Sequence, residues 1–169
     1  MDPPKRKQLR LREYDYSQPG YYFVTICTAV RNQNILCTID SVGAAALGGP
    51  PHVALTPAGQ AVRELIDHMD HVYSNVTVDT FVIMPDHVHL ILALSTPEGG
   101  SPRAATPTAS IPQVVNALKG LAVKQTGIRP LWQRGYYDHV IRSDHDLQET
   151  HEYIGNNPLK WTLNKEGPT

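Results

Sequence analysis

Two histidines, His87 and His89, stand two residues apart in the otherwise aliphatic stretch MPDHVHLILAL, residues 84–94. Side chains alternate along a strand, so both imidazoles point to one face, roughly 6–7 Å apart along the strand. Neutral imidazole is a common ligand of divalent metal ions, and two such rings can bind one ion. The alternative is a pair of half-exposed histidines in a cross-strand hydrogen-bond network. Two ligands do not complete a hydrolytic or transfer site, so a third ligand and a nucleophile must come from elsewhere.

The segment HEYIGNNP, residues 151–158, is one place to look for them. Tyr153 and Asn157 are four residues apart, and on a regular helix such positions point the same way. A tyrosine with an amide one turn later, on an added helix, is suggestive but not specific, since a tyrosine that packs on a sheet gives the same pattern. Tyr136 and Tyr137 are rival tyrosines on a predicted strand. They must point to opposite faces, so at most one can reach the histidines.

The elements that must position these residues follow from periodicity and from turn and cap residues. The predicted order is β-α-β-β-α-β-α, with Pro85 and Asp86 as the turn between the second and third strands and Pro158 ending the last helix. The strands are expected at 21–30, 76–84, 87–94 and 136–142, and the helices at 56–73, 111–127 and 143–157. The first six elements predict an α+β chain with the ferredoxin-like split βαβ fold, an antiparallel four-stranded sheet with helices on one face. The terminal helix, which carries the tyrosine, is added to that fold.

The strand at 87–94 has one all-aliphatic face, which the helices should cover. Its members are Val88, Leu90, Leu92 and Leu94. The histidines then lie on the opposite face, at the beginning of the strand.

A chain of 169 residues is most simply one domain. We expect a basic N-terminal arm at 1–20 and a single catalytic domain at 21–169, with mobile Gly-, Ala- and Pro-rich loops at about 41–55 and 95–110. The formal net charge is −1, but basic residues gather near the start of the chain, where they form either a solvated tail or an arm that grips nucleic acid. These are Lys5, Arg6, Lys7, Arg10 and Arg12.

No run of about eighteen apolar residues occurs, so no membrane span is expected. The charged N-terminus has no apolar core, which excludes a secretory signal. Cys27 and Cys37 have no metal-binding spacing and fit reduced thiols of a cytoplasmic protein, with Cys27 in a strand of the core.

The chain resembles the REP-associated tyrosine transposases, a branch of the single-tyrosine transposases that carry a His-hydrophobic-His motif. Four motifs carry the resemblance in order along nearly the whole chain: YYFVTICT, FVIMPDHVHLILAL, LWQRGYYDHVIRSDHDL and YIGNNP. The resemblance implies that His87 and His89 bind Mg²⁺ or Mn²⁺, that Tyr153 is the nucleophile and that Asn157 is a third ligand. It also implies a ferredoxin-like fold and a substrate of single-stranded or hairpin DNA. Such relatives include monomers and dimers, so a homodimer stays open.

Three functions are consistent with these residues. The leading hypothesis is metal-dependent nicking and rejoining of single-stranded DNA through a 5′-phosphotyrosine at Tyr153. The first alternative is a catalytically silent ferredoxin-like module that binds nucleic acid, and the second is a phosphodiesterase that uses water in place of Tyr153.

Overall fold

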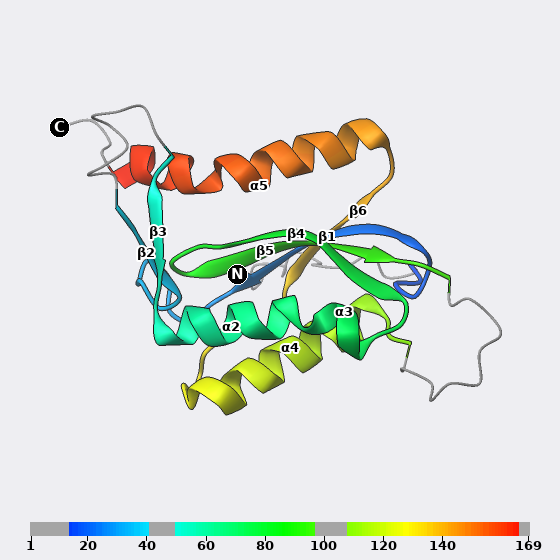
Figure 1. Ribbon diagram of the computed structural model, residues 1–169, viewed down its shortest axis with the longest axis horizontal. Helices are drawn as coiled ribbons and strands as arrows, with labels where there is room; N and C mark the ends of the chain where they lie inside the picture. The colour runs from blue at the N-terminus through cyan, green and yellow to red at the C-terminus, as the bar shows by residue number, and fades with distance from the viewer. Residues whose placement is uncertain (1–13, 41–49, 97–107, 166–169) are drawn as a thin grey trace, which may run out of the picture.

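A computed structural model describes residues 14–40, 50–96 and 108–165 (Figure 1). The basic arm residues Lys5 to Arg12 and most of the two predicted loops lie outside the described residues. The strands are β1 (Gly20–Cys27), β2 (Cys37–Asp40), β3 (His52–Leu55), β4 (Val76–Ile83), β5 (His87–Leu94) and β6 (Tyr137–Ile141). The helices are α2 (Pro57–Asp67), α3 (Met69–Val72), α4 (Ile111–Thr126) and α5 (Asp144–Lys165).

Four strands form one antiparallel sheet in the order β4-β5-β1-β6. This order, with a helical connection before β4 and another before β6, is that of the split βαβ fold, so the predicted fold class is confirmed. The sheet lies between two helical layers (Figure 1), with α2, α3 and α4 on one side and α5 on the other. The helices of the predicted fold do lie on one face, and the added helix covers the opposite, histidine-bearing face.

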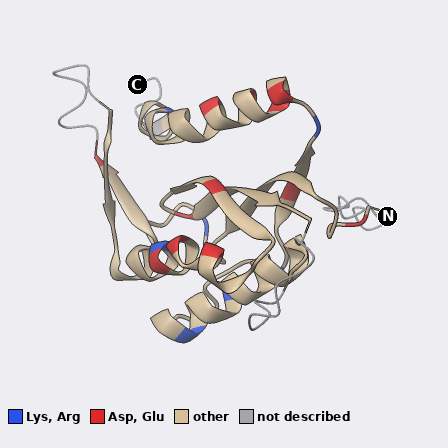
Figure 2. Cartoon of the chain, turned by 45° about the vertical axis from the view of Figure 1, so that its right-hand side comes forward, with Lys and Arg blue, Asp and Glu red and all other residues tan. Residues whose placement is uncertain are grey.

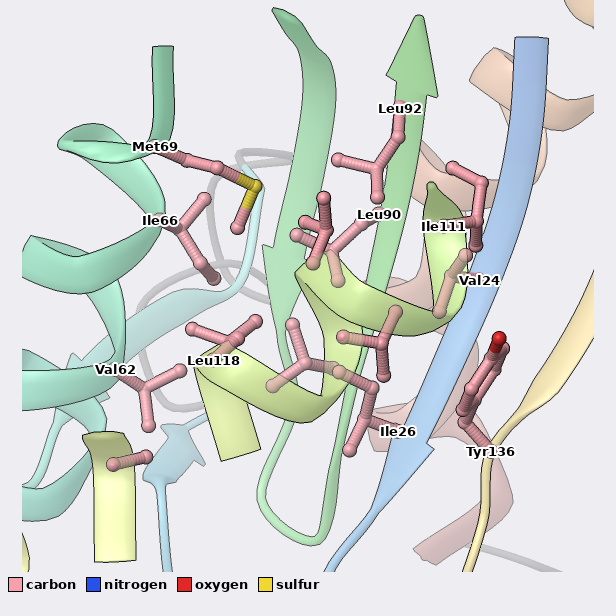
Figure 3. Packing of buried hydrophobic residues seen from close by; sticks show 14 of the residues in the cluster. Val24, Ile26, Val62, Ile66, Met69, Leu90, Leu92, Ile111, Leu118 and Tyr136 are labelled. Atoms are coloured by element: carbon pink, nitrogen blue, oxygen red, sulfur yellow. The ribbon is translucent and has the colours of Figure 1, made fainter. Parts of the chain in front are cut away.

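The main core fills the space between the sheet and α2 and α4 (Figure 3). From β5 it takes the aliphatic face predicted from the sequence, Val88, Leu90, Leu92 and Leu94. Val24 and Ile26 of the neighbouring strand β1 point into the same layer, and both are fully buried. The alternation of side chains therefore assigns the two faces of the sheet as expected.

Helix ends follow the cap residues. The Thr56 hydroxyl accepts a hydrogen bond from the Gly59 amide at 3.1 Å, and α2 begins at the next residue, Pro57. The predicted helix at 56–73 is divided at His68 into α2 and the short α3. Helix α4 ends at Gly127, whose φ of 70° is the left-handed conformation that favours glycine.

Two predictions about elements are wrong. The loop expected at 41–55 includes strand β3, which pairs with β2 in a separate two-stranded sheet. Helix α5 does not end before Pro158 but continues to Lys165. A proline inside a helix costs about 3 kcal/mol, because it removes one backbone hydrogen bond and crowds the preceding turn. Packing offsets that cost, since Trp161, beyond the proline, contacts a small second core of Cys37, Ile39 and Met84.

None of the helices in the described part of the chain is both long and apolar enough to cross a lipid bilayer.

Candidate active site

His87 and His89 lie side by side at the beginning of β5, with ring centroids 4.6 Å apart. Each imidazole uses its Nδ1 atom for a hydrogen bond within the protein. Nδ1 of His87 is 2.7 Å from Oδ1 of Asp86, and Nδ1 of His89 is 2.8 Å from Oγ1 of Thr25. When both Nδ1 atoms carry the proton and donate it, both Nε2 atoms keep a free lone pair. This is the tautomer that a metal ligand needs.

The two histidines are more buried than the sequence suggested. His89 is only 4% exposed, because α5 covers its face of the sheet, so it is not half exposed. The cross-strand hydrogen bond of the alternative interpretation is present, between His89 and Thr25. Burial, with a smaller effect from neighbouring His87, lowers the pKa of His89 to about 3. Burial also lowers the pKa of His87, although Asp86 opposes this shift. Both rings are therefore neutral near pH 7, as metal binding requires.

Asp86 is held in place by its own contacts and in turn orients His87. Its carboxylate is fully buried in the turn between β4 and β5, where it accepts the Asn32 amide hydrogen at 2.8 Å and pairs with Arg31 Nε at 3.1 Å. Burial raises the pKa of Asp86, but the hydrogen bonds from His87 and Asn32 and the charge of Arg31 outweigh it, and the pKa is lowered. The ionised carboxylate thus holds His87 in one orientation.

Tyr153 projects from α5 over the histidine face. Its ring centroid lies 5.3 Å from that of His89 and 5.9 Å from that of Phe23, edge-on to both. The residue is 42% exposed, so it can be reached from solvent. Lys160, two helical turns later, places its Nζ 5.2 Å from the centre of the Tyr153 ring. A cation, a phenol and two imidazoles therefore lie close together on one side of the sheet.

Asn157 lies one turn after Tyr153, as predicted, and is 8% exposed. Its Nδ2 donates a hydrogen bond to the Tyr153 carbonyl at 3.1 Å. This bond fixes the direction of the amide and leaves Oδ1 as the atom that can act as a ligand. No cluster of three His, Cys, Asp or Glu ligands occurs among the described residues, so a third ligand from the protein would have to be of another type.

The residues present fit a divalent cation. Nε2 of His89 is buried and has no hydrogen-bond partner among the described residues. Such an atom costs free energy unless something binds it. Neutral imidazole nitrogens with an amide oxygen are suitable ligands for Mn²⁺, and Mg²⁺ accepts the same oxygen with waters completing its shell.

The rival nucleophiles are less well placed. Tyr136 is 3% exposed and points into the main core under the helices (Figure 3). Tyr137, the other tyrosine of the pair, lies on the histidine face of the sheet. It is half exposed and lies on β6 directly opposite Thr25 of β1. Burial raises the pKa of Cys27 above its usual value and that of Cys37 to about 12, so both thiols stay protonated and unreactive.

Sequence reasoning named the histidines and Tyr153 but missed the residues that orient them. Asp86 was assigned only to a turn, and turn aspartates are usually exposed. Thr25 could have been found from strand pairing, since it lies directly opposite His89. Lys160 follows Tyr153 by seven residues, two turns of one helix, but the prediction that α5 ends before Pro158 hid this relation.

Comparison with curated proteins gives relatives that match most of this chain. A protein of Haemophilus influenzae with no assigned function is 29% identical over 172 residues, which cover 92% of this chain and 89% of that protein. A second protein of the same organism, named "Putative REP-associated tyrosine transposase", is 27% identical over 155 residues, 86% of this chain and 74% of that protein. No protein-family model matches the chain.

Among solved structures, a REP-associated tyrosine transposase bound to a REP hairpin matches 89% of this chain and 73% of its own. The TM-score is 0.59 at 21% identity, a likeness that shows a common fold. The resemblance to the REP-associated tyrosine transposases, first seen in four sequence motifs, is thus confirmed both by similarity along the chain and by a shared fold.

Proposed function

We propose that this protein cuts and rejoins single-stranded DNA in a metal-dependent reaction, through a covalent 5′-phosphotyrosine at Tyr153, on hairpin-forming repeat DNA. One observation carries the proposal: the open phenol of Tyr153 lies 5.3 Å, ring to ring, from a buried histidine whose Nε2 atom has no partner among the described residues. The relative named as a tyrosine transposase and the neighbour bound to a REP hairpin support the same kind of substrate.

His87 and His89, with Asn157 Oδ1, would hold the cation. A bound Mg²⁺ or Mn²⁺ would polarise the scissile phosphate and orient it for attack. Asp86 and Thr25 engage the Nδ1 atoms of the two imidazoles, which leaves both Nε2 atoms available to the cation. The sheet would therefore supply fixed ligands for the cation, and the helix above it would supply the nucleophile.

Tyr153 supplies the oxygen that attacks phosphorus. The new bond joins Tyr153 Oη to the phosphate, the bond to the 3′ oxygen breaks, and the proton lost by the phenol is balanced by the one gained by the leaving 3′-hydroxyl. A phenol with a pKa near 10 is a weak nucleophile, so positive charge beside it is useful. Lys160 lies over the Tyr153 ring and can offset the negative charge that develops there.

The phosphotyrosine keeps the energy of the broken diester, so a second DNA end with a 3′-hydroxyl can attack it and restore the strand without a nucleotide cofactor. This property separates breaking and rejoining from hydrolysis.

The test uses a hairpin oligonucleotide with single-stranded flanks, labelled at its 5′ end in one sample and at its 3′ end in another, with Mn²⁺ or Mg²⁺. A 5′-phosphotyrosine retains the 3′-labelled fragment on the protein in denaturing gels and releases the 5′-labelled fragment with a 3′-hydroxyl. Cleavage without retained label would indicate the water-dependent phosphodiesterase. Binding without cleavage would indicate the silent nucleic-acid-binding module.

A further inference from the structure

An open hollow of about 340 Å³ lies beside Tyr153, on the side of the sheet formed by β1 and β6. Its walls are Phe23, His139, Glu149, Thr150 and Tyr153 itself. We propose that this hollow binds one nucleobase of the single-stranded DNA substrate by stacking, with little preference among the four bases. The proposal rests on the proposed function for the nature of the substrate.

The position of the hollow connects it to the reaction. Tyr153 is both a wall of the hollow and the proposed nucleophile, so a phosphate within reach of its hydroxyl brings a neighbouring base to the hollow. Phe23 is the wall shared with the histidines, since its ring stacks on His89 at 5.2 Å between centroids and meets Tyr153 edge-on at 5.9 Å. A hollow of this volume falls within the usual range of small-molecule sites, about 300–1,000 Å³.

The apolar part of the lining is aromatic. Phe23 and Tyr153 present ring surfaces, on which bases of single-stranded DNA stack with little regard to sequence. Aromatic walls therefore explain binding of a base without a strong preference among the four.

The other three residues of the lining use their polar atoms in contacts with α5. Nε2 of His139 lies 2.9 Å from Oδ2 of Asp146. The Thr150 hydroxyl donates to the Asp146 carbonyl at 2.7 Å, and one carboxylate oxygen of Glu149 lies 3.4 Å from Nδ1 of His145. The hollow is therefore mainly an apolar surface.

A mainly apolar, aromatic hollow fits the face of a base and does not distinguish the hydrogen-bonding edges of the four bases. The acidic residues along the first half of α5, visible in Figure 2, disfavour a DNA phosphate in this position. The hollow therefore fits a base better than the DNA backbone.

The experiment measures binding without cleavage. The full-length protein in EDTA is titrated against a fluorescently labelled hairpin oligonucleotide, with a single abasic site moved through its single-stranded flank. We expect one position at which loss of the base raises Kd about tenfold, the magnitude of one lost stacking contact. In Phe23→Leu, which keeps an apolar side chain but removes the ring, that position should become insensitive while the others are unchanged.

The second arm places each of the four bases at the sensitive position. The four values of Kd should be similar, because stacking on aromatic side chains tolerates every base. Glu152→Gln is the control variant, since Glu152 is on the same helix as Tyr153, is exposed and does not line the hollow. It should keep the sensitive position that Phe23→Leu loses.

Two results would overturn the proposal that the hollow binds a base. One is a Kd that does not depend on the position of the abasic site, and the other is a sensitive position that persists in Phe23→Leu. A difference of about tenfold or more among the four bases would show recognition of a base edge and would overturn binding by stacking. These measurements distinguish failure of the base-binding site from failure of the proposed strand-transfer function. A covalent adduct with no base effect removes this site and leaves the transfer reaction, whereas a base effect with no adduct leaves a base-binding site on a silent module.

Discussion

The buried carboxylate of Asp86 lies 2.7 Å from Nδ1 of the adjacent His87, so the turn that joins β4 to β5 also orients the first histidine of the pair. Carboxylates that hold a ligand histidine in this way raise the basicity of its other nitrogen and fix its direction. The short PD turn is therefore part of the site and not only a connection between strands.

Asp86→Asn tests this relationship. An asparagine side chain has one acceptor oxygen, so it cannot accept from both His87 and the Asn32 amide, as the carboxylate does. We expect Mn²⁺ affinity to fall by about 10–100-fold, measured by isothermal titration calorimetry on protein shown to be folded by circular dichroism. Asp70→Asn is the control, because Asp70 accepts a backbone amide of β4 at 2.8 Å. Equal Mn²⁺ affinity in the two variants would contradict the role of Asp86.

His89→Ala should change stability as well as metal binding. His89 is 4% exposed and in stacking contact with Phe23, so truncation leaves a cavity under α5. We expect the free energy of unfolding to fall by about 1–3 kcal/mol with cooperative unfolding retained, and Mn²⁺ binding to be lost. Urea denaturation and calorimetry measure the two effects. His89→Gln fills more of the space and should recover stability without recovering metal affinity. Mn²⁺ binding at the level of the unmodified chain in either variant would remove His89 from the ligand set.

The order of the main elements could be predicted because each carries its own periodicity and its own end signals. Strand β5 has the predicted bounds, and α4 ends before Gly127 as expected. The exceptions depend on contacts distant in sequence. Strand β3 is four residues long and, within the described part of the chain, pairs with β2 alone. The second half of α5 is maintained by Trp161, which packs on the small second core. Local signals such as Pro158 cannot report packing of that kind.

The candidate site, like the fold, was predicted from the sequence only in part. The histidine pair and the tyrosine were visible because their spacing matches the strand and helix periods. That Tyr153 meets His89 depends on α5 crossing the back of the sheet, which spacing does not specify. The burial of His89 was mispredicted for the same reason, since the helix that covers it was expected only as an addition of unspecified position.

Gly155→Ala should stabilise the chain. Gly155 lies inside α5, and a Cβ built there meets no atom within 4 Å. Alanine loses less backbone entropy than glycine on folding, so we expect a gain of about 0.5–1 kcal/mol, measured as a higher urea midpoint. Gly120→Ala in α4 is the matched variant, since its Cβ also meets open space. A loss of stability in Gly155→Ala alone would show that α5 needs local freedom near Pro158.

Deletion of residues 1–12 tests the predicted arm. The deletion removes Lys5, Arg6, Lys7, Arg10 and Arg12, and each phosphate contact contributes counterion release. We expect weaker binding to single-stranded DNA and a shallower dependence of log Kd on log salt concentration, measured by fluorescence anisotropy between low and moderate salt. Adduct formation at saturating DNA should persist. An unchanged salt slope would show that the segment is a solvated tail.

Tyr153→Phe separates the two interpretations of the tyrosine. Phenylalanine keeps the ring that packs edge-on against His89 and Phe23, so the free energy of unfolding and the Mn²⁺ and DNA affinities should stay close to those of the unmodified chain. The covalent adduct should disappear completely, since no other atom supplies the attacking oxygen. Excess Mn²⁺ should not restore it, whereas Asn157→Ala, which weakens only the hold on the cation, should regain adduct as Mn²⁺ is raised.

Tyr137→Phe is the matched control, because Tyr137 is the half-exposed tyrosine on the same face of the sheet and its hydroxyl should be dispensable. Mass spectrometry of the DNA-linked peptide gives the deciding measurement: a link at Tyr137, or an adduct that survives in Tyr153→Phe, would show that the helix does not carry the nucleophile.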